Sequence, residues 1–390
     1  MVFPILVQIL GGVKRAPIVD QREEDFITVR TALGQKALTV VSRNIYLGGV
    51  IAPVLAVGFS DLKALAPVAG RVWEEVQAND FRERVVILVD EIEAARPDII
   101  GLQEMARFLT LELKRPEGSL EVTGVLDFQE ILEEELKVRN LPYSFVAAQN
   151  NSSVAVPVEG IDLDGGFIPT RLVQLTIRDA AVVRNGLDVQ AVSQGHYQAV
   201  MNLGVDAIGN PIELKRGWIR VDTTVRGVPY HFVSTHLEIQ PFSRIQEQQA
   251  QELLTEIVAD LGGVTVLMGD FNSNADGSFG DPSWTTTYGE IIAAGFDDAW
   301  ALANSGETSG GLTCCHESDL KNSDPTFDQR IDFVFLRASN LKGQGTRIFP
   351  GLVDVEIVGA DPSIRTTPSG LWPSDHAGLV VYLGPGLSPS

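Results

Sequence analysis

Val266-Leu267-Met268-Gly269-Asp270-Phe271-Asn272-Ser273-Asn274 is an apolar run that stops at a glycine and delivers a carboxylate and a carboxamide two residues apart. Residues 264–268 are predicted to form a short buried strand, and side chains two apart in an extended chain face the same way. Asp270 and Asn272 should therefore project together from the strand end, where they suit a hard cation or a phosphate. Gly, Asp, Asn and Ser also form turns, so the segment alone is equally consistent with an Asx turn after a strand.

The composition indicates a chain with a large core and an acidic surface. Of the 390 residues, 44% are hydrophobic, and 30 Lys plus Arg stand against 51 Asp plus Glu, which gives a net charge of -21 and a pI near 4.6. This balance argues against a protein held to nucleic acid by a broad basic face. It does not exclude a nuclease, because a bound metal neutralises a phosphate locally without a basic surface.

The first 36 residues are predicted to be an N-terminal extension. Residues 20–25 are strongly charged, and the apolar residues 1–10 have no basic segment before them, so they fit a strand, a surface anchor or a remnant of a processed leader. No apolar run reaches the ~20 residues of a membrane helix. Cys314 and Cys315 are adjacent and lack metal-finger spacing, so we interpret them as small buried hydrophobes. The compartment, cytoplasmic or secreted, stays open.

Hydrophobic periodicity predicts strands that alternate with helices along the rest of the chain. The pair 218–225 and 228–236 flanks Arg226-Gly227, which is a clear hairpin signal. Predicted strands span 37–47, 98–104, 142–148, 172–183, 189–203 (one strand or a pair), 264–268, 330–336 and 378–383. Predicted helices span 61–77, 81–95, 128–138, 241–261, 286–294 and 297–303, and the Gly-, Pro- or Ser-rich segments 150–169 and 305–324 are predicted to be loops.

Polar residues recur at the ends or edges of these apolar strands. A single member is easily explained otherwise: Glu104 could simply leave the core for water, and a lone histidine such as His236 is usually a hydrogen-bonded surface residue. The recurrence is harder to explain as scattered surface polarity. The set comprises Asn44, Glu104, His236, Asp270 with Asn272, Asp332, and Asp375 with His376.

Together these residue types are suited to metal-assisted hydrolysis of a phosphate ester. Glu104 would hold a divalent cation, Mg²⁺ or Mn²⁺ with Ca²⁺ as a further option, and Asn44 and Asp375 would complete the site directly or through water. The second group acts on protons. His236 and His376 would donate protons or hydrogen bonds to the phosphate, Asp332 would fix the tautomer of His376, and Asp270 with Asn272 would align and deprotonate the attacking water.

Six short motifs that contain the candidate residues occur in the same order as the motifs of a known superfamily. Ser42-Arg43-Asn44, Ile100-Gly101-Leu102-Gln103-Glu104, Ser234-Thr235-His236-Leu237, Gly269-Asp270-Phe271-Asn272, Arg330-Ile331-Asp332-Phe333 and Ser374-Asp375-His376 resemble the endonuclease/exonuclease/phosphatase superfamily, whose fold is that of deoxyribonuclease I. Arg43-Asn44-Ile45-Tyr46-Leu47-Gly48, Lys215-Arg216-Gly217-Trp218 and Thr313-Cys314-Cys315 are similar to a bacterial branch of it without an assigned substrate. The extension has no counterpart in the core fold of this superfamily, and the long loops 150–170 and 305–328 carry no recognisable motif.

The resemblance implies an α+β fold, a four-layer α/β/β/α sandwich of two mainly antiparallel sheets flanked by helices. It covers residues 37–384 as one domain, since the candidate residues run from Asn44 to His376, and leaves 385–390 as a C-terminal tail. It also implies the same roles as above: Glu104, Asn44 and Asp375 at the metal, Asp332 with His376 on the phosphate side, Asp270 and Asn272 at the nucleophile, and His236 as acid or phosphate clamp.

Three functions follow in order of preference. The first is a Mg²⁺- or Mn²⁺-dependent phosphodiesterase, either a nuclease or a hydrolase of small organic phosphodiesters. The second is a sphingomyelinase-like phospholipase, which would need an exposed aromatic or apolar hairpin; Trp218 and Trp284 are the hints of one. The third is a non-catalytic binding module on the same fold. The expected partner is a phosphate-ester substrate, from nucleic acid, a small phosphodiester or a phospholipid headgroup, and no obligate protein partner is evident.

Overall fold

Two β-sheets stacked face to face form the centre of the computed structural model. The structure describes residues 38–384 apart from 115–117, 165, 226–227, 278–283, 305–309 and 340–352, and all of them belong to the unit Leu38–Ser390. The predicted N-terminal extension and C-terminal tail lie outside the described residues. In the described part of the chain, no helix is both long enough and apolar enough to span a membrane.

The first sheet has the strand order β15-β16-β1-β2-β6-β3-β4, with β5 paired to β6. Its pairs are antiparallel except β1 with β2, which run parallel. The strands are β1 (Leu38–Asn44), β2 (Ile99–Gln103), β3 (Arg107–Lys114), β4 (Ser119–Asp127), β5 (Tyr143–Leu163), β6 (Gly166–Arg184), β15 (Val353–Val358) and β16 (Gly378–Leu383).

The second sheet has the order β13-β14-β12-β11-β10-β7 and also contains one parallel pair, β11 with β12. Its strands are β7 (Val189–His196), β10 (Gly217–Val225), β11 (Val228–His236), β12 (Gly263–Asp270), β13 (Asp297–Asp298) and β14 (Asp332–Ser339). A separate two-stranded sheet joins β8 (Met201–Val205) to β9 (Pro211–Leu214).

The main core lies between the two large sheets. Val40 and Ile99 from the first sheet and Val266 and Val334 from the second belong to one cluster and are 0% exposed. Fully burying an aliphatic side chain of this size stabilises the fold by about 1.5–3 kcal/mol. The apolar, β-branched strands are therefore held together by the faces they turn toward each other.

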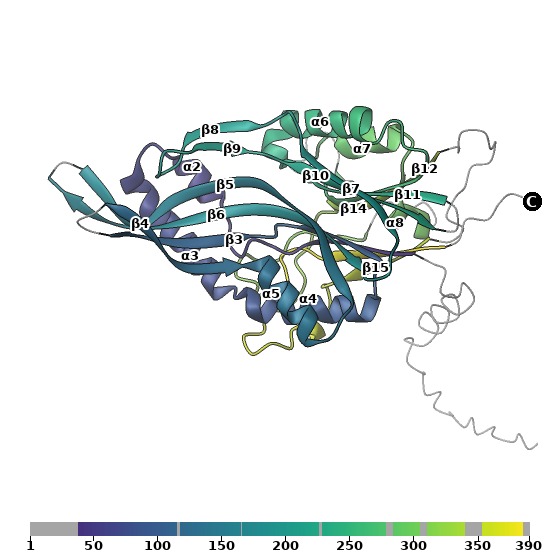
Figure 1. Cartoon of the computed structure of the whole chain (residues 1–390), viewed down its shortest axis with the longest axis horizontal. Coiled ribbons are helices and arrows are strands. Elements are labelled where there is room, and N and C mark those ends of the chain that lie inside the picture. The colour runs from purple at the N-terminus through teal and green to yellow at the C-terminus, as the bar shows by residue number, and fades with distance from the viewer. Residues whose placement is uncertain are drawn as a thin grey trace, which may run out of the picture. The chain divides into compact units, whose positions relative to one another are not determined.

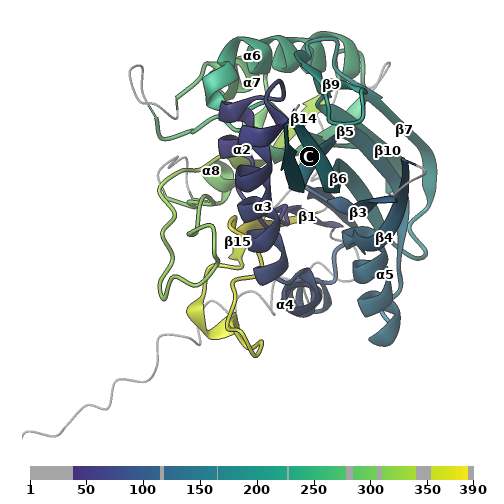
Figure 2. The ribbon, with the colours of Figure 1, turned by 90° about the vertical axis from the view of Figure 1, so that its left-hand side faces the viewer.

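Helices cover the outer faces of both sheets (Figures 1 and 2). In both views α4 and α5 lie on the side of the first sheet, and α6 and α7 lie beyond the second. The helices are α2 (Ala52–Val57), α3 (Leu62–Ala78), α4 (Phe81–Ala95), α5 (Phe128–Val138), α6 (Ser243–Glu252) continued by a π-helical turn (Leu253–Ile257), α7 (Thr287–Ala293) and α8 (Ala299–Ala303). The predicted four-layer sandwich of two mainly antiparallel sheets is confirmed.

Most predicted elements are found within a few residues of their expected bounds, and the N-terminus of α4 is capped by Asp80, whose side chain accepts from the Arg82 N–H. The helix predicted over 241–261 starts later and changes to π-helical hydrogen bonding at Leu253. The segment 189–203 is a pair of strands that belong to different sheets.

One prediction was wrong: segment 150–169 is not a surface loop. It forms the outer part of the long β5–β6 hairpin, with register pairs from Tyr143↔Arg184 out to Leu163↔Gly166. Pro157 is tolerated because, among the strands that the structure describes, β5 pairs with β6 alone and its other side is a sheet edge, where a strand can lack an N–H donor. Pro169 lies opposite Gly160, beyond Arg171, where β3 stops pairing with β6.

Candidate active site

The strand register brings the candidate residues to the same end of both sheets. In the first sheet the parallel β1–β2 pair sets Asn44 opposite Gln103, so Glu104 emerges immediately after the strand end. In the second sheet the parallel β11–β12 pair sets His236 opposite Asp270, and the antiparallel β12–β14 pair sets Asp332 opposite Asp270. Residues distant in the sequence therefore meet where β1, β2, β11 and β12 end and β14 begins.

His376 is held by Asp332. The imidazole Nδ1 lies 2.8 Å from Oδ2 of Asp332, and the two side chains are 7% and 1% exposed. The backbone around the histidine is also fixed: its N–H donates to Ser374 Oγ at 3.2 Å, and the Arg43 guanidinium donates to its carbonyl. This arrangement leaves Nε2 as the ring nitrogen directed toward other groups of the site.

Asp270 is at the centre of the cluster. Its Oδ1 accepts from the Asn272 backbone N–H at 2.9 Å, and its Oδ2 accepts from Asn44 Nδ2 at 3.1 Å. The same Oδ2 lies 3.5 Å from Nε2 of His236 and 3.9 Å from Nε2 of His376. One carboxylate oxygen thus faces two imidazoles.

Glu104 stands at a backbone position with a left-handed φ of 61°. Its Oε2 accepts from the Leu47 N–H at 2.8 Å, and its Oε1 accepts from Asn44 Nδ2 at 3.2 Å. The oxygen of the Asn44 side chain points the other way and accepts from the Tyr46 N–H at 3.0 Å. Asn44 therefore donates to both carboxylates through its amide nitrogen, an orientation that differs from the direct oxygen ligand considered above.

Asn272 is fixed next to Asp270 but does not share its partners. It has a φ of 51°, and its side-chain Nδ2 donates to the Leu237 carbonyl at 3.0 Å. Its own carbonyl accepts from Gln246 Nε2 at 2.8 Å. Asn272 thus ties the loop after β12 to the loop after β11 and presents its backbone N–H to Asp270.

Asp375 completes the acidic side of the site. Its Oδ1 lies 4.0 Å from Nε2 of His376 and accepts from Ser374 Oγ at 3.4 Å. Burial raises the pKa of Asp375 to about 6, and the nearby Glu104 and Asp332 add to this rise against the opposing effects of His376 and Arg84.

Arg84 itself is fully buried and donates to the carbonyls of Asn79, Ile45, Pro373 and Tyr46.

The site holds several buried carboxylates whose negative charges shift the pKa values of the groups around them. Burial and the neighbouring Asp332 raise the pKa of Asp270 to about 7. Burial by itself would lower the pKa of His376, but Asp332, Asp375 and Asp270 hold it well above its usual value. The pKa of His236 is lowered by burial and by the nearby Arg216 and His376. Asp332 Oδ1 has no hydrogen-bond partner within the described residues.

A divalent cation fits this donor set, because it would offset the repulsion among buried carboxylates. Two groupings of ligands meet here. Asp270, Asp332 and His376 have ligand atoms within 4.8 Å of one another, but Asp332 already binds the histidine. Glu104 and Asp375 form the second grouping, since the charge of Glu104 raises the pKa of Asp375. Neither carboxylate lies within hydrogen-bond distance of an imidazole.

A family model decides the identity of the fold. The model described as "Endonuclease/Exonuclease/phosphatase family" matches residues 68–376, which include every candidate residue except Asn44. The chain belongs to this family. The resemblance seen in the sequence motifs is therefore confirmed, and members of the family are typically metal-dependent phosphoesterases.

Three solved structures are similar to this chain at low sequence identity. An endonuclease/exonuclease/phosphatase family protein from Leptotrichia buccalis C-1013-b is 14% identical, with a TM-score of 0.47 over 89% of this chain and 99% of its own. A protein of the same description from Beutenbergia cavernae DSM 12333 is 18% identical, with a TM-score of 0.47 over 91% and 73%. D. rerio TDP2, solved with a single-strand DNA product, is 14% identical, with a TM-score of 0.47 over 89% and 98%. No curated protein sequence matches the chain.

Within this family fold, sequence reasoning missed a second polar layer behind His236. Asp179 of β6 is 1% exposed, and its Oδ1 lies 3.9 Å from Nδ1 of His236. Asn151 of β5 donates to the other oxygen of Asp179 at 2.6 Å. Burial raises the pKa of Asp179 to about 7. The available signal was an aspartate inside an apolar, alternating strand, which needs a partner.

The cysteine pair lies beside the site. Cys314 forms an isolated antiparallel bridge with His376, and the Ala377 N–H donates to the Thr313 carbonyl at 2.8 Å. Cys314 is 3% exposed, and the sulfurs of Cys314 and Cys315 form a vicinal disulfide. The segment that carries the cysteines thus supports the backbone of His376, a position that adjacency in the sequence did not indicate.

Proposed function

We propose that this protein is a divalent-metal-dependent phosphodiesterase that hydrolyses its substrate by attack of water. The observation that supports this most is the single oxygen of Asp270 lying 3.5 Å from His236 Nε2 and 3.9 Å from His376 Nε2, with the second histidine fixed by Asp332. Residues 38–384 would act as one catalytic domain, since the proposed site draws on strands from both sheets.

Glu104 and Asp375 would hold Mg²⁺ or Mn²⁺, with Ca²⁺ as a further option, and Asn44 would keep Glu104 in place through the 3.2 Å hydrogen bond. When bound, such a cation polarises a phosphoryl oxygen and offsets the charge that develops in the transition state. The hydrogen bond from Leu47 fixes the other oxygen of Glu104. Two contacts, one from the last residue of β1 and one from the loop after it, therefore orient one carboxylate toward the site.

The histidines and Asp270 would handle the protons. Asp270, aligned by the Asn272 N–H and by Asn44, is placed to orient and deprotonate the attacking water. Asp332 holds Nδ1 of His376, so that Nε2 is free to donate to a phosphate oxygen. His236, whose Nε2 lies 3.5 Å from Asp270 Oδ2, would serve as acid or phosphate clamp.

The test is hydrolysis of bis(p-nitrophenyl) phosphate by the full chain. Activity should need added Mg²⁺ or Mn²⁺, disappear in EDTA, and fall by a factor on the order of 10²–10⁴ in Glu104→Ala, Asp270→Ala and His376→Ala. His231→Ala is the control, because His231 is paired with Asp222 at 2.7 Å on the β10–β11 hairpin and has no role in the proposed site. Wild-type rates in the three site variants would refute the proposal.

The substrate class is tested with a panel of plasmid DNA, sphingomyelin vesicles, and small di- and monoesters. One observation favours the phospholipase alternative: the outer part of the β5–β6 hairpin exposes Ile161, Leu163 and Ile168 by 43%, 51% and 36%. Trp218, one of the two hints taken from the sequence, is instead partly buried and packs against the hydrophobic cluster that includes Val233, Leu267 and Phe335. With a net charge of -21, weak DNA binding without metal is expected. Inactivity across the whole panel would favour a binding module.

A further inference from the structure

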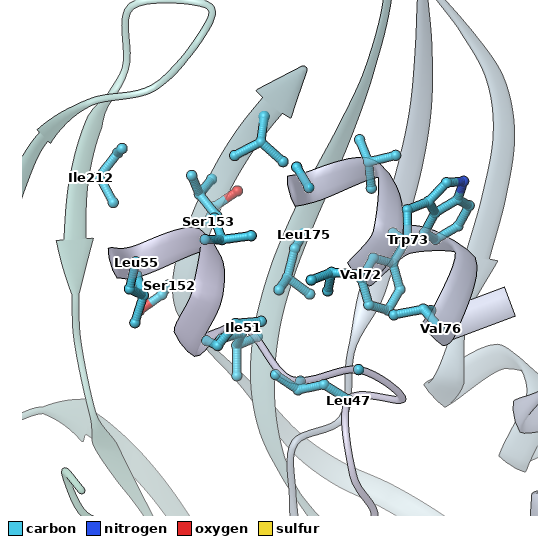
Figure 3. Close-up of a pocket in the computed structure, with 18 of the residues that line it drawn as sticks. Leu47, Ile51, Leu55, Val72, Trp73, Val76, Ser152, Ser153, Leu175 and Ile212 are labelled. Atoms are coloured by element: carbon cyan, nitrogen blue, oxygen red, sulfur yellow. The ribbon is translucent and has the colours of Figure 1, made fainter. Parts of the chain in front are cut away.

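An apolar cavity of about 70 Å³ lies next to the proposed site. Helices α2 and α3 form one wall, and strands β5, β6 and β9 form the other. Figure 3 shows the side chains of Leu55, Val72 and Leu175, from two helices and a strand, bordering one space. Apart from Gly49 and two serines, every described lining residue is apolar or aromatic.

Two parts of the wall are joined directly to the site. Leu47 lines the cavity, and its backbone N–H donates to Oε2 of Glu104 at 2.8 Å. On the opposite wall, Ser152 follows Asn151, which donates to Asp179 behind His236. On one side, the lining residue Leu47 is hydrogen-bonded to the proposed metal ligand Glu104. On the other side, the lining residue Ser152 is the chain neighbour of Asn151, which binds the Asp179 carboxylate next to His236.

The two serines of the wall are already satisfied by the protein. Ser152 Oγ accepts from the Lys215 N–H at 2.9 Å, and Ser153 Oγ contacts Thr176 Oγ1 and Gln174 Nε2 at 3.2 Å each. A polar occupant such as a nucleobase would therefore lose its hydrogen bonds to water without replacing them, which is costly. The apolar lining of the cavity therefore favours a hydrocarbon group as its occupant.

The volume of the cavity favours an alkyl chain over an aromatic ring. An engineered protein cavity of about 150 Å³ accepts benzene, whereas this space is about half as large. A slim alkyl chain fits where a ring does not. The lining residue Leu55 is only half-buried, so part of the apolar wall is in contact with solvent.

We propose that the cavity binds the hydrocarbon chain of the substrate, which makes the substrate a single-chain amphiphilic phosphodiester. This inference rests on the proposed phosphodiesterase function for the position of the phosphate. With the phosphate at Glu104 and the histidines, the alkyl group bonded to it would pass Leu47 and enter between α2, α3 and β6.

The first experiment compares alkyl p-nitrophenyl phosphates from methyl to octyl, kept monomeric, with the full chain and Mg²⁺ or Mn²⁺. Each methylene that enters the cavity should raise kcat/KM about fourfold, so the butyl ester should exceed the methyl ester by at least about tenfold. Leu55→Asp should bring this ratio close to one. Val57→Asp, on the same helix but outside the cavity and 37% exposed, should leave the ratio unchanged.

The second experiment measures binding without catalysis. Trp73 lines the cavity, so a bromooctyl methyl phosphate in EDTA should quench its fluorescence saturably, and the quenching should be lost in Trp73→Phe and in Leu55→Asp. Hydrolysis with no chain-length dependence and no quenching would overturn the inference and leave the proposed function standing. Quenching without hydrolysis of any ester would support the cavity and refute the proposed function.

Discussion

Replacing Asp332 by Asn tests the reasoning about the histidine most directly. Asp332 is 1% exposed and lies 2.8 Å from Nδ1 of His376, so an isosteric amide keeps the packing and removes the charge. The amide N–H can donate to Nδ1 only when Nδ1 carries no proton. The variant would therefore favour a neutral His376 ring with its proton on Nε2. A histidinium formed during the reaction would lose its counter-charge.

The expected loss follows from what this pair does. A charge-assisted hydrogen bond contributes about 1.5–3 kcal/mol, and loss of the correct tautomer and orientation adds to it. We expect a total of about 3–5 kcal/mol, which corresponds to a fall in kcat of about 10²–10⁴. The assay is steady-state hydrolysis of bis(p-nitrophenyl) phosphate at saturating Mg²⁺ or Mn²⁺, with circular dichroism to confirm folding.

The protein supplies a matched control. Asp222 lies 2.7 Å from Nδ1 of His231, and both side chains are 16% exposed, on the β10–β11 hairpin. Asp222→Asn removes the same kind of charge from the same kind of pair and should leave kcat within about twofold of wild type, because this pair lies outside the proposed site. A folded Asp332→Asn variant with kcat within threefold of wild type would refute the role assigned to Asp332.

Three further predictions concern the metal, the loops and the central strand. Glu104→Gln should raise the metal concentration for half-maximal activity about 10–100-fold in a metal titration; an unchanged value would remove Glu104 from the ligand set. Arg84→Met should lower the free energy of unfolding by about 3–5 kcal/mol in urea, because four buried carbonyls lose their donor; a change below about 1 kcal/mol would contradict this. Gly269→Ala should cost about 3 kcal/mol or more in the same assay, because φ is 147° and a Cβ would lie 1.9 Å from the Thr235 carbonyl oxygen, whereas Gly262→Ala meets no atom within 4 Å and should be nearly neutral.

Local patterns in the sequence were enough for most elements and for the candidate residues. The run that ends at Gly269-Asp270 is β12, and the hairpin around 226–227 is β10 with β11, because alternation and turn residues act over a few neighbours. The outer half of the β5–β6 hairpin escaped the same reasoning. Its glycines and two prolines are typical of a loop, and only pairing along an open edge makes them acceptable in strands.

The residue types at strand ends therefore indicated the reaction class from the sequence alone, with the family motifs in their order. The tertiary structure decided how these residues meet. The parallel pairs β1–β2 and β11–β12 set which strand ends are level, and hydrogen bonds across these strand ends direct the Asn44 amide nitrogen toward Glu104 and Asp270. The Asp179 layer and the apolar cavity are also products of packing between distant segments, which no local pattern encodes.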